Sequence, residues 1–588
     1  MSKSFVPVPF VLLWRLFFAQ FFTSESVTSD IHLRERAVWV LAFLLVPGVF
    51  IVILLYPEFT AAVIRARVGR GPASYIDDML GWVAFVLTTY AMAGTGFITV
   101  LAWDALTFDR KDAAILGPLP LRRVTLIAAK LAAVGTLLLA GSIPIDLLNA
   151  AVFAFASSDQ LGGGVLVTHF AAIFVATVGA SIFIFAAIVM LRGTVALLGG
   201  PRLTSALGSP LQFCFIVALL CLVILCPAVS PTRFMTNARA NWLPPAWFVG
   251  VFEALRGSPR LLDVEFQLLT LARRASMATA IAITGAVIVS VVEFRRHIDP
   301  ALARGAAAER LRSARVSRIL ARVLVGGDAV ARATSDFILL TIARNREQQA
   351  PIAINTAIGA AIVIAALSRS ARDLSSLMHP RTAVLWIPLV IGYSLAIGAR
   401  ASFFVPSELP ASWVFRANAS ESGRSCWSAV RASMMALVVP PTLLITAVLT
   451  IPLLGWRVAA WHALFVCAVA TLLTEVVAQT IHHIPFTRPY QPGHAKLKTR
   501  WWIYGLGVLA FAYWPARLEL RMLDNPVALL EAVTSMATAI GVLEVAGRRR
   551  AGSWPMEESA EPAGDVASFT VLDLAGIRTA SPLRIPNP

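Results

Sequence analysis

Charged side chains are scarce in this sequence, since Asp, Glu, Lys and Arg make up only 14% of its 588 residues. Soluble domains contain about 25% of them. Apolar residues make up 58% of the chain. A water-soluble core cannot hide so much apolar surface, and one membrane anchor needs only about 20 apolar residues. The composition therefore excludes a soluble enzyme, a disordered scaffold, a coiled coil and a secreted disulfide-rich domain. It predicts an all-α, polytopic integral membrane protein.

Cysteine is also rare, with five residues in the chain. Four of them lie inside apolar runs, and no pair has the spacing of metal ligands beside histidines. The nucleotide-binding pattern GxxxxGK[ST], the zinc-protease pattern HExxH and the nucleophile pattern GxSxG are all absent. We therefore expect no catalytic residue, no metal site and no cofactor bound by this chain.

Acidic residues are outnumbered by basic ones, 33 against 50, which gives a net charge of +17. In a soluble protein this excess would suggest a nucleic-acid partner. In a membrane protein it is explained by Lys and Arg that gather in cytoplasmic loops, so we expect no nucleic-acid partner. The segment 294–350 holds eleven arginines and is expected to be cytoplasmic.

Apolar runs long enough to cross a bilayer recur along the chain. Two of them are short, so we expect ten to twelve spans. Counting outward from the basic segment places both termini in the cytoplasm and the protein in the plasma or inner membrane. The loop 231–274 is then external, against the rule, because it carries six arginines. The expected spans are 37–56, 79–103, 126–155, 165–191, 211–230, 275–293, 351–367, 382–400, 434–455, 458–480, 502–516 and 526–546.

The pattern of the chain looks duplicated. Each half opens with an amphipathic stretch, Phe5–Phe22 in the first and Asp336–Arg346 in the second, which we expect to lie in the membrane interface. About six spans follow in each half. Because six is an even number, the halves would have the same orientation. We therefore expect two parallel six-helix halves, 1–300 and 301–550, and a disordered cytoplasmic tail, 551–588.

Ionisable residues are few in the expected spans, and a charge in lipid costs a few kcal/mol, so each one is a candidate for function. Asp146 lies with Asn149 in the third span, and Glu475 lies with Gln479 in the tenth. One interpretation places these four side chains on a polar translocation path. The other gives them structural roles, as groups near a helix end or as carboxylates paired with a loop arginine.

The first long cytoplasmic loop, which follows Trp103, combines a charged cluster, a short apolar run and a Pro-Leu-Pro turn. This order predicts a short helix on the membrane surface, with its charged face open to a soluble partner. An ordinary basic loop is the alternative. The candidate contact residues are Asp104, Asp109, Arg110, Lys111, Asp112, Pro118 and Pro120.

This loop resembles the "DRRD…LxPLP…K" segment of permeases in the ABC-2 type exporter superfamily, especially large fused bacterial proteins that lack their own ATPase domain. The matching residues are Asp109, Arg110, Lys111, Asp112, Pro118, Leu119, Pro120 and Lys130. The later segment Phe404–Arg416 is similar to "PxELxANWxFR" of the same group, with Ser412 in place of Asn. Its candidate residues are Glu408, Trp413 and Arg416.

The resemblance implies the transmembrane permease subunit of an ATP-driven exporter. A separate cytoplasmic ATPase subunit would bind ATP and contact both loops, so this chain would be a transport component and not an enzyme. Two other interpretations stay open. One is an ion-coupled secondary transporter that uses Asp146 and Glu475, and the other is a membrane assembly protein that transports nothing. The sequence is also compatible with a homodimer.

Overall fold

The structure is a computed structural model in which the described residues form helices joined by short turns. No strand occurs among them. The described residues are 8–20, 57, 59–66, 68–69, 74–103, 122–158, 163–225, 242–258, 267–301, 319, 323, 325–370, 384–405, 423–486 and 501–552. The expected all-α class is confirmed for these residues.

The helices follow one another along both halves of the chain. They are α1 (Val8–Gln20), α3 (Ser74–Leu101), α5 (Arg123–Ser158), α6 (Gly163–Leu225), α8 (Pro244–Leu255), α9 (Leu268–Ala301), α11 (Ala329–Arg344), α12 (Arg346–Ser370), α15 (Ile387–Phe403), α17 (Gly423–Leu454), α18 (Trp456–Ala478), α19 (Trp501–Met522) and α20 (Pro526–Ala551).

Within the described ranges, eight helices are long and apolar enough to cross a bilayer, so the fold is that of a membrane-embedded protein. Eight of the expected spans coincide with these helices. Two more, 211–230 and 382–400, correspond to the shorter apolar helices Pro210–Leu225 and Ile387–Phe403. The expected span 502–516 lies in α19, and 37–56 lies outside the described residues. The number twelve and the two equivalent halves stay predictions.

Local sequence sets where several helices begin. Asp328 caps α11, since its carboxylate accepts hydrogen bonds from the backbone N–H groups of Val330 and Ala331 at 3.0 and 3.1 Å. A hydrogen bond from the Ser425 side chain, at the start of α17, lowers the pKa of Asp328. Gly455 alone separates α17 from α18 and has a φ of 79°, a conformation that glycine adopts without strain. Tight links of this kind make neighbouring helices antiparallel.

Helix α6 has two legs. Its 63 residues would extend over about 95 Å if straight, three times the apolar thickness of a bilayer. The ring of Trp103 lies 5.3 Å from the guanidinium of Arg192 and 6.0 Å from the ring of Phe215. Residues 192 and 215 would be about 35 Å apart in a straight helix. The helix therefore turns back between them, around the sequence Gly199-Gly200-Pro201.

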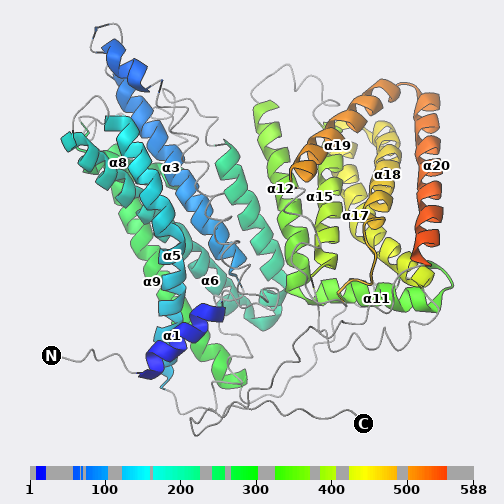
Figure 1. The fold of residues 1–588 in the computed structure, drawn as a ribbon, viewed down its shortest axis with the longest axis horizontal. Coiled ribbons are helices and arrows are strands. Elements are labelled where there is room, and N and C mark those ends of the chain that lie inside the picture. The colour runs from blue at the N-terminus through cyan, green and yellow to red at the C-terminus, as the bar shows by residue number, and fades with distance from the viewer. Residues whose placement is uncertain are drawn as a thin grey trace, which may run out of the picture.

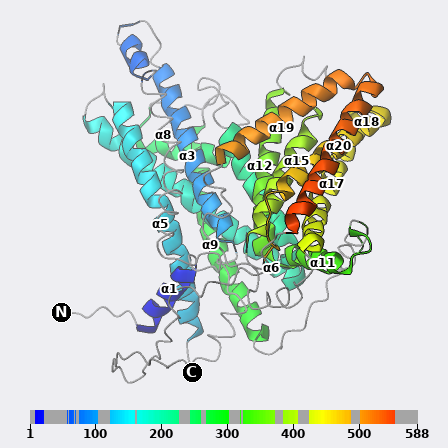
Figure 2. The ribbon, with the colours of Figure 1, turned by 45° about the vertical axis from the view of Figure 1, so that its right-hand side comes forward.

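The helices pack in two groups, which we call bundle A and bundle B. Bundle A consists of α1, α3, α5, α6, α8 and α9, and bundle B of α11 to α20. Figures 1 and 2 show the two groups side by side, with α1 and α11 at the same end of the molecule. We call this end basal and the opposite end distal. The second leg of α6 contacts α12 and joins the bundles.

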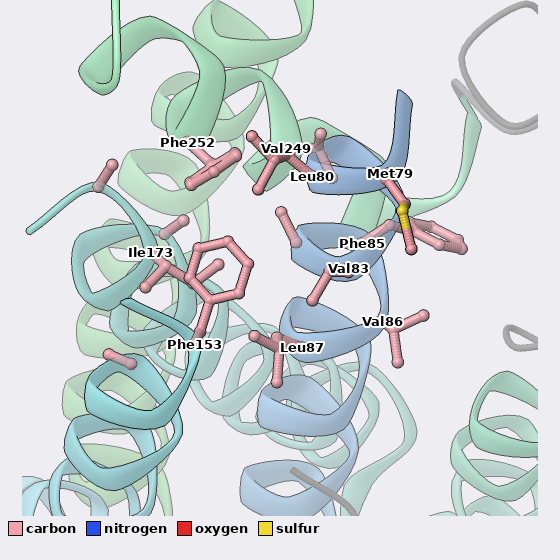
Figure 3. Close-up of a cluster of buried hydrophobic side chains, with 14 of the residues drawn as sticks. Met79, Leu80, Val83, Phe85, Val86, Leu87, Phe153, Ile173, Val249 and Phe252 are labelled. Atoms are coloured by element: carbon pink, nitrogen blue, oxygen red, sulfur yellow. The ribbon is translucent and has the colours of Figure 1, made fainter. Parts of the chain in front are cut away.

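Each bundle has its own apolar core. In bundle A, one face of α3 packs on α5, α6 and α8. Leu87 of α3, Phe153 of α5 and Phe252 of α8 are fully or nearly fully buried in this core. Figure 3 shows the Phe153 ring between α3 and the helices that face it. In bundle B, the core joins α11, α15, α17 and α18, and Phe403 and Val430 lie in it without exposure. Close packing of these side chains fixes the helices around the polar groups described next.

Candidate coupling and translocation site

The candidate coupling residues of both loops lie outside the described residues. They are Asp104, Asp109, Arg110, Lys111, Asp112, Pro118, Pro120, Glu408, Trp413 and Arg416. The helix ends that flank the loops are described. The first loop joins α3 to α5 and the second joins α15 to α17. Both loops therefore start and end at the basal end of the molecule (Figure 1).

In bundle A, helix α1, which the sequence predicts to lie in the membrane interface, packs on the first turns of α5. Phe17 is fully buried in a cluster with Leu126, Ala129 and Ala133. The ammonium group of Lys130 lies 4.8 Å from the centre of the Phe17 ring, a cation–π contact. Lys130 is the last residue of the loop motif and is 4% exposed. The loop motif therefore ends on α5, the helix against which α1 packs.

In bundle B, helix α11 packs on the first turns of α17 in the same way. Ile338 of α11 belongs to one apolar cluster with Phe403 and Val430. The hydroxyl groups of Ser335 and Ser433 lie 3.0 Å apart and are both buried. In each bundle, therefore, a helix that the sequence predicts to lie in the membrane interface contacts the basal turns of the helix that follows the candidate coupling loop.

Asp146 lies midway along the distal part of α5 and is 1% exposed. The Ser181 hydroxyl of α6 donates to its carboxylate at 3.0 Å and lies 3.4 Å from the carbonyl oxygen of Ala91 on α3. The side-chain oxygen of Asn149, one turn further along α5, is buried without a hydrogen-bond partner. Three helices thus meet at this polar spot inside bundle A.

Glu475 is fully buried near the basal end of α18 and forms an ion pair with Arg431 of α17. Arg431 also lies 3.1 Å from Glu544 of α20. Gln479 donates to the carbonyl oxygen of Leu543 at 2.9 Å. The geometry is that of a carboxylate neutralised by an arginine inside bundle B. Because Asp146 lies in bundle A, the structure does not bring the two carboxylates together.

Helix α8 is a feature that the sequence did not indicate. At its first turn, the Thr88 hydroxyl of α3 lies 3.4 Å from the carbonyl oxygen of Pro245. At its end, Arg256 binds Asp77 of α3 at 2.8 Å. Eleven residues separate the two contacts on each helix, about 16 Å. Helix α8 therefore runs antiparallel to the distal half of α3 and reaches the middle of that helix.

The contacts at the end of α8 form a small ionic cluster. Arg256 also binds Glu253, one turn earlier, at 2.7 Å, and its guanidinium lies 5.6 Å from the Phe252 ring centre. Glu253 is 1% exposed, and one of its carboxylate oxygens has no hydrogen-bond partner. A non-spanning helix at membrane depth is stable only where protein covers it. The ionic cluster at the end of α8, and the packing of its apolar face in the core of bundle A, provide this protein cover.

A second polar pair lies near the distal end of bundle B. The Nδ1 atom of His462 on α18 lies 2.6 Å from a carboxylate oxygen of Glu519 on α19. Both side chains are fully buried. Sequence analysis missed this pair because Glu519 lies beyond the expected span 502–516. A histidine and a carboxylate on consecutive helices would have been the available signal.

No group of three or more His, Cys, Asp or Glu side chains that could hold a metal occurs among the described residues. Comparisons with models of protein families, with curated proteins and with solved structures give no match. The site is therefore interpreted from its own geometry and from the motifs of the sequence.

Proposed function

We propose that this chain is the membrane permease of an ATP-driven exporter, powered by a separate cytoplasmic ATPase of the ABC type. One observation carries the proposal. In both bundles, the loop that bears the candidate coupling motif begins and ends at the basal end and leads into a helix held by an interfacial helix. A force on either loop would therefore reach α5 with α1, or α17 with α11, as one unit.

In this mechanism, ATP-driven dimerisation of the ATPase subunits moves the loops around Asp109–Pro120 and Glu408–Arg416. The two bundles then tilt as rigid bodies around the contact between α6 and α12. Such a change requires that ATP favour one arrangement of the bundles over the other, by about 5.5 kcal/mol for a nearly complete switch. The chain itself binds no nucleotide and supplies the path.

The surroundings of Glu475 favour this mechanism over an ion-coupled carrier. A coupling carboxylate must be free to exchange its proton or ion during the transport cycle. Glu475 is instead paired with Arg431 in a buried position, and breaking such a pair costs about 3–5 kcal/mol. Asp146, which contacts a hydroxyl group and no described cation, stays the better candidate for the translocation path.

The test is affinity purification of the tagged full-length protein from its native host in mild detergent, with identification of the proteins that elute with it. We expect an ATPase with a nucleotide-binding loop in stoichiometric amount. The variant Asp109→Ala/Arg110→Ala/Asp112→Ala/Arg416→Ala should lose this partner. A matched control removes two basic and two acidic exposed residues of the distal end, namely Arg457, Arg517, Asp524 and Glu531, and should keep it.

Absence of an ATPase from an intact wild-type preparation would contradict the proposal. The ion-coupled alternative is then tested by Asp146→Asn and Glu475→Gln, which should abolish transport under that mechanism and leave it largely intact under ATP drive. If neither an ATPase nor an ion-dependent flux is found, the assembly protein is the interpretation that survives.

A further inference from the structure

The buried pair of His462 and Glu519 has no part in the proposed export mechanism. Both side chains are fully buried, and their contact of 2.6 Å joins α18 to α19 near the distal end. The remaining polar atoms, Nε2 of His462 and the second carboxylate oxygen of Glu519, are buried without a hydrogen-bond partner. Native proteins rarely leave buried polar atoms unpaired, so this pair requires an explanation.

The surroundings of the pair are apolar. Phe465 and Val466 follow His462 by one turn on α18, and Ala516 precedes Glu519 by one turn on α19. These side chains share one buried cluster with Leu389 of α15, and Met536 of α20 packs against it. In such surroundings a net charge is far more costly than a neutral pair.

The other charged groups of the helices around α19 do not compensate the pair. Helices α15, α18 and α20 pack against α19, and α17 also packs against α18. The charged residues of α17, Arg424 and Arg431, lie in its basal turns. The charged residue of α15, Arg400, binds Thr480 at the basal end. Among the described residues, His462 is the one titratable group in contact with Glu519. Among the described residues of bundle B, the other charged side chains at its distal end are exposed, namely Arg457, Arg517, Arg521, Asp524 and Glu531.

We propose that His462 and Glu519 form a proton-binding pair that holds α19 against α18. In the closed arrangement the pair keeps one titratable proton, because an imidazolium with a carboxylate, or an imidazole with a carboxylic acid, has no net charge. In an open arrangement α19 has moved away from α18 and water reaches both groups. Opening above a threshold pH then releases this proton to the solvent, and closing takes it up again.

The pH range in which a rise of pH favours opening follows from the proton count. In water an imidazole binds its proton below about pH 6.5 and a carboxyl group below about pH 4.3. Between these values the open and closed pairs hold one proton each, so pH has no effect. Above about pH 6.5 the open pair holds none, and the ratio of closed to open protein falls up to tenfold for each pH unit. Below about pH 4.3 the open pair holds two, so acid also favours opening.

The experiment measures the distance between α18 and α19 in the full-length protein. Spin labels are placed on Val476→Cys and Leu506→Cys, two exposed positions that lie more than three helical turns from the pair. The native cysteines are replaced by alanine, and the protein is held in nanodiscs at pH 6.0 and pH 8.5. We expect the closed distance to predominate at pH 6.0 and to lose up to about a hundredfold in its ratio to the open one at pH 8.5.

The matched control is the double variant His462→Leu/Glu519→Leu, which replaces the buried pair by apolar side chains and should fold. Its distance distribution should be the same at both pH values. A label pair on α17 and α18, Val448→Cys with Val476→Cys, reports on the α17–α18 contact, which the proposed movement of α19 leaves unchanged, and should respond to pH in neither protein.

Two results would overturn the proposal: a wild-type distance that does not change with pH, or a double variant that changes as the wild type does. The inference goes beyond the exporter proposal and does not depend on it, because the measurement contains neither an ATPase nor a cargo. Failure of the ATPase purification would leave it standing, and its own failure would leave the exporter proposal standing.

Discussion

Among the described residues, three buried carboxylates have a specific partner on another helix. Asp146 contacts Ser181, Glu475 contacts Arg431, and Glu519 contacts His462. A lone carboxylate in an apolar interior would cost several kcal/mol, and each partner lies on a neighbouring helix. The polar contacts therefore determine which helices lie side by side, in addition to any role in transport.

The ion pair of Glu475 and Arg431 gives a test at the scale of single residues. Arg431→Met leaves Glu475 buried without its cation and should lower the free energy of unfolding by about 3–5 kcal/mol. The double variant Arg431→Met/Glu475→Met should recover most of this loss, because it removes both charges. Unfolding in sodium dodecyl sulfate, followed by tryptophan fluorescence, measures the difference.

Arg548→Gln is the control for this series. Arg548 binds Glu544 at 2.6 Å, but its side chain is 57% exposed, so its loss should cost about 0.5 kcal/mol or less. A single variant of Arg431 as stable as the wild type would show that the pair contributes nothing. A double variant as unstable as the single one would show that Arg431 acts through another contact.

At the residue scale, the sequence indicated the two intramembrane carboxylates but not their partners. Arg431 was assigned to a loop because the expected span began at 434, whereas α17 begins at Gly423. A hydropathy window excludes the polar first turns of a helix even when they continue it. The expected pairing of a carboxylate with an arginine is therefore found for Glu475, but Arg431 lies in helix α17 and not in a loop. The coupling residues of the two loops stay predictions.

At the scale of elements, the longest apolar helices were predictable and the shortest was not. Helix α8 has twelve residues, too few for a spanning window, so the loop 231–274 was interpreted as wholly external. The arginines of that loop conflicted with the positive-inside rule. One of them, Arg256, lies at the end of α8 in an ionic cluster. An arginine that is neutralised by protein contacts carries little information about topology.

The close packing of α8 on α9 gives a test at this scale. Gly250 lies so close to α9 that an added Cβ atom would be 2.6 Å from the backbone nitrogen of Ala272 and from the backbone oxygen of Leu268. Gly250→Ala should therefore push α8 away from α9 and cost about 3 kcal/mol, at the upper end of overpacking effects. The thermal unfolding midpoint of the purified protein measures this loss.

Gly541→Ala on α20 is the matched control, because an added Cβ atom there meets no heavy atom within 4 Å. Alanine favours a helix over glycine, so this variant should be unchanged or more stable by about 0.5–1 kcal/mol. Equal midpoints for the two variants would mean that α8 is not held as closely as the structure has it.

At the scale of the whole molecule, two correspondences support the predicted duplication. Helix α1 packs on the first turns of α5 in bundle A, and helix α11 packs on the first turns of α17 in bundle B. The next long helix of each bundle, α6 or α18, carries a buried histidine at its seventh residue, His169 or His462. The sequence predicted the repeat from the amphipathic stretch that opens each half and from the number of spans. The histidines could not have been aligned without the helix starts, and the duplication stays a prediction.

The contact between α6 and α12 gives the test at this scale, because it joins the two bundles. Ala357 of α12 is fully buried there in a cluster with Ile216 and Leu219 of α6. A protease site inserted after Arg312 in the full-length protein allows the chain to be cut after folding in the membrane. If the contact holds the bundles together, the two fragments should remain associated through affinity purification in mild detergent.

Ala357→Trp forces a large side chain into this closely packed contact and should separate the fragments after the cut. Ile358→Trp is the matched control, since the neighbouring residue is 41% exposed and should tolerate the ring. Fragments that stay together in both variants would mean that other contacts join the bundles. Fragments that separate in the wild type would mean that only the uncut chain around Arg312 joins the bundles. Only if Ala357→Trp separates them does the α6–α12 contact become the place where a rigid tilt of one bundle is transmitted to the other.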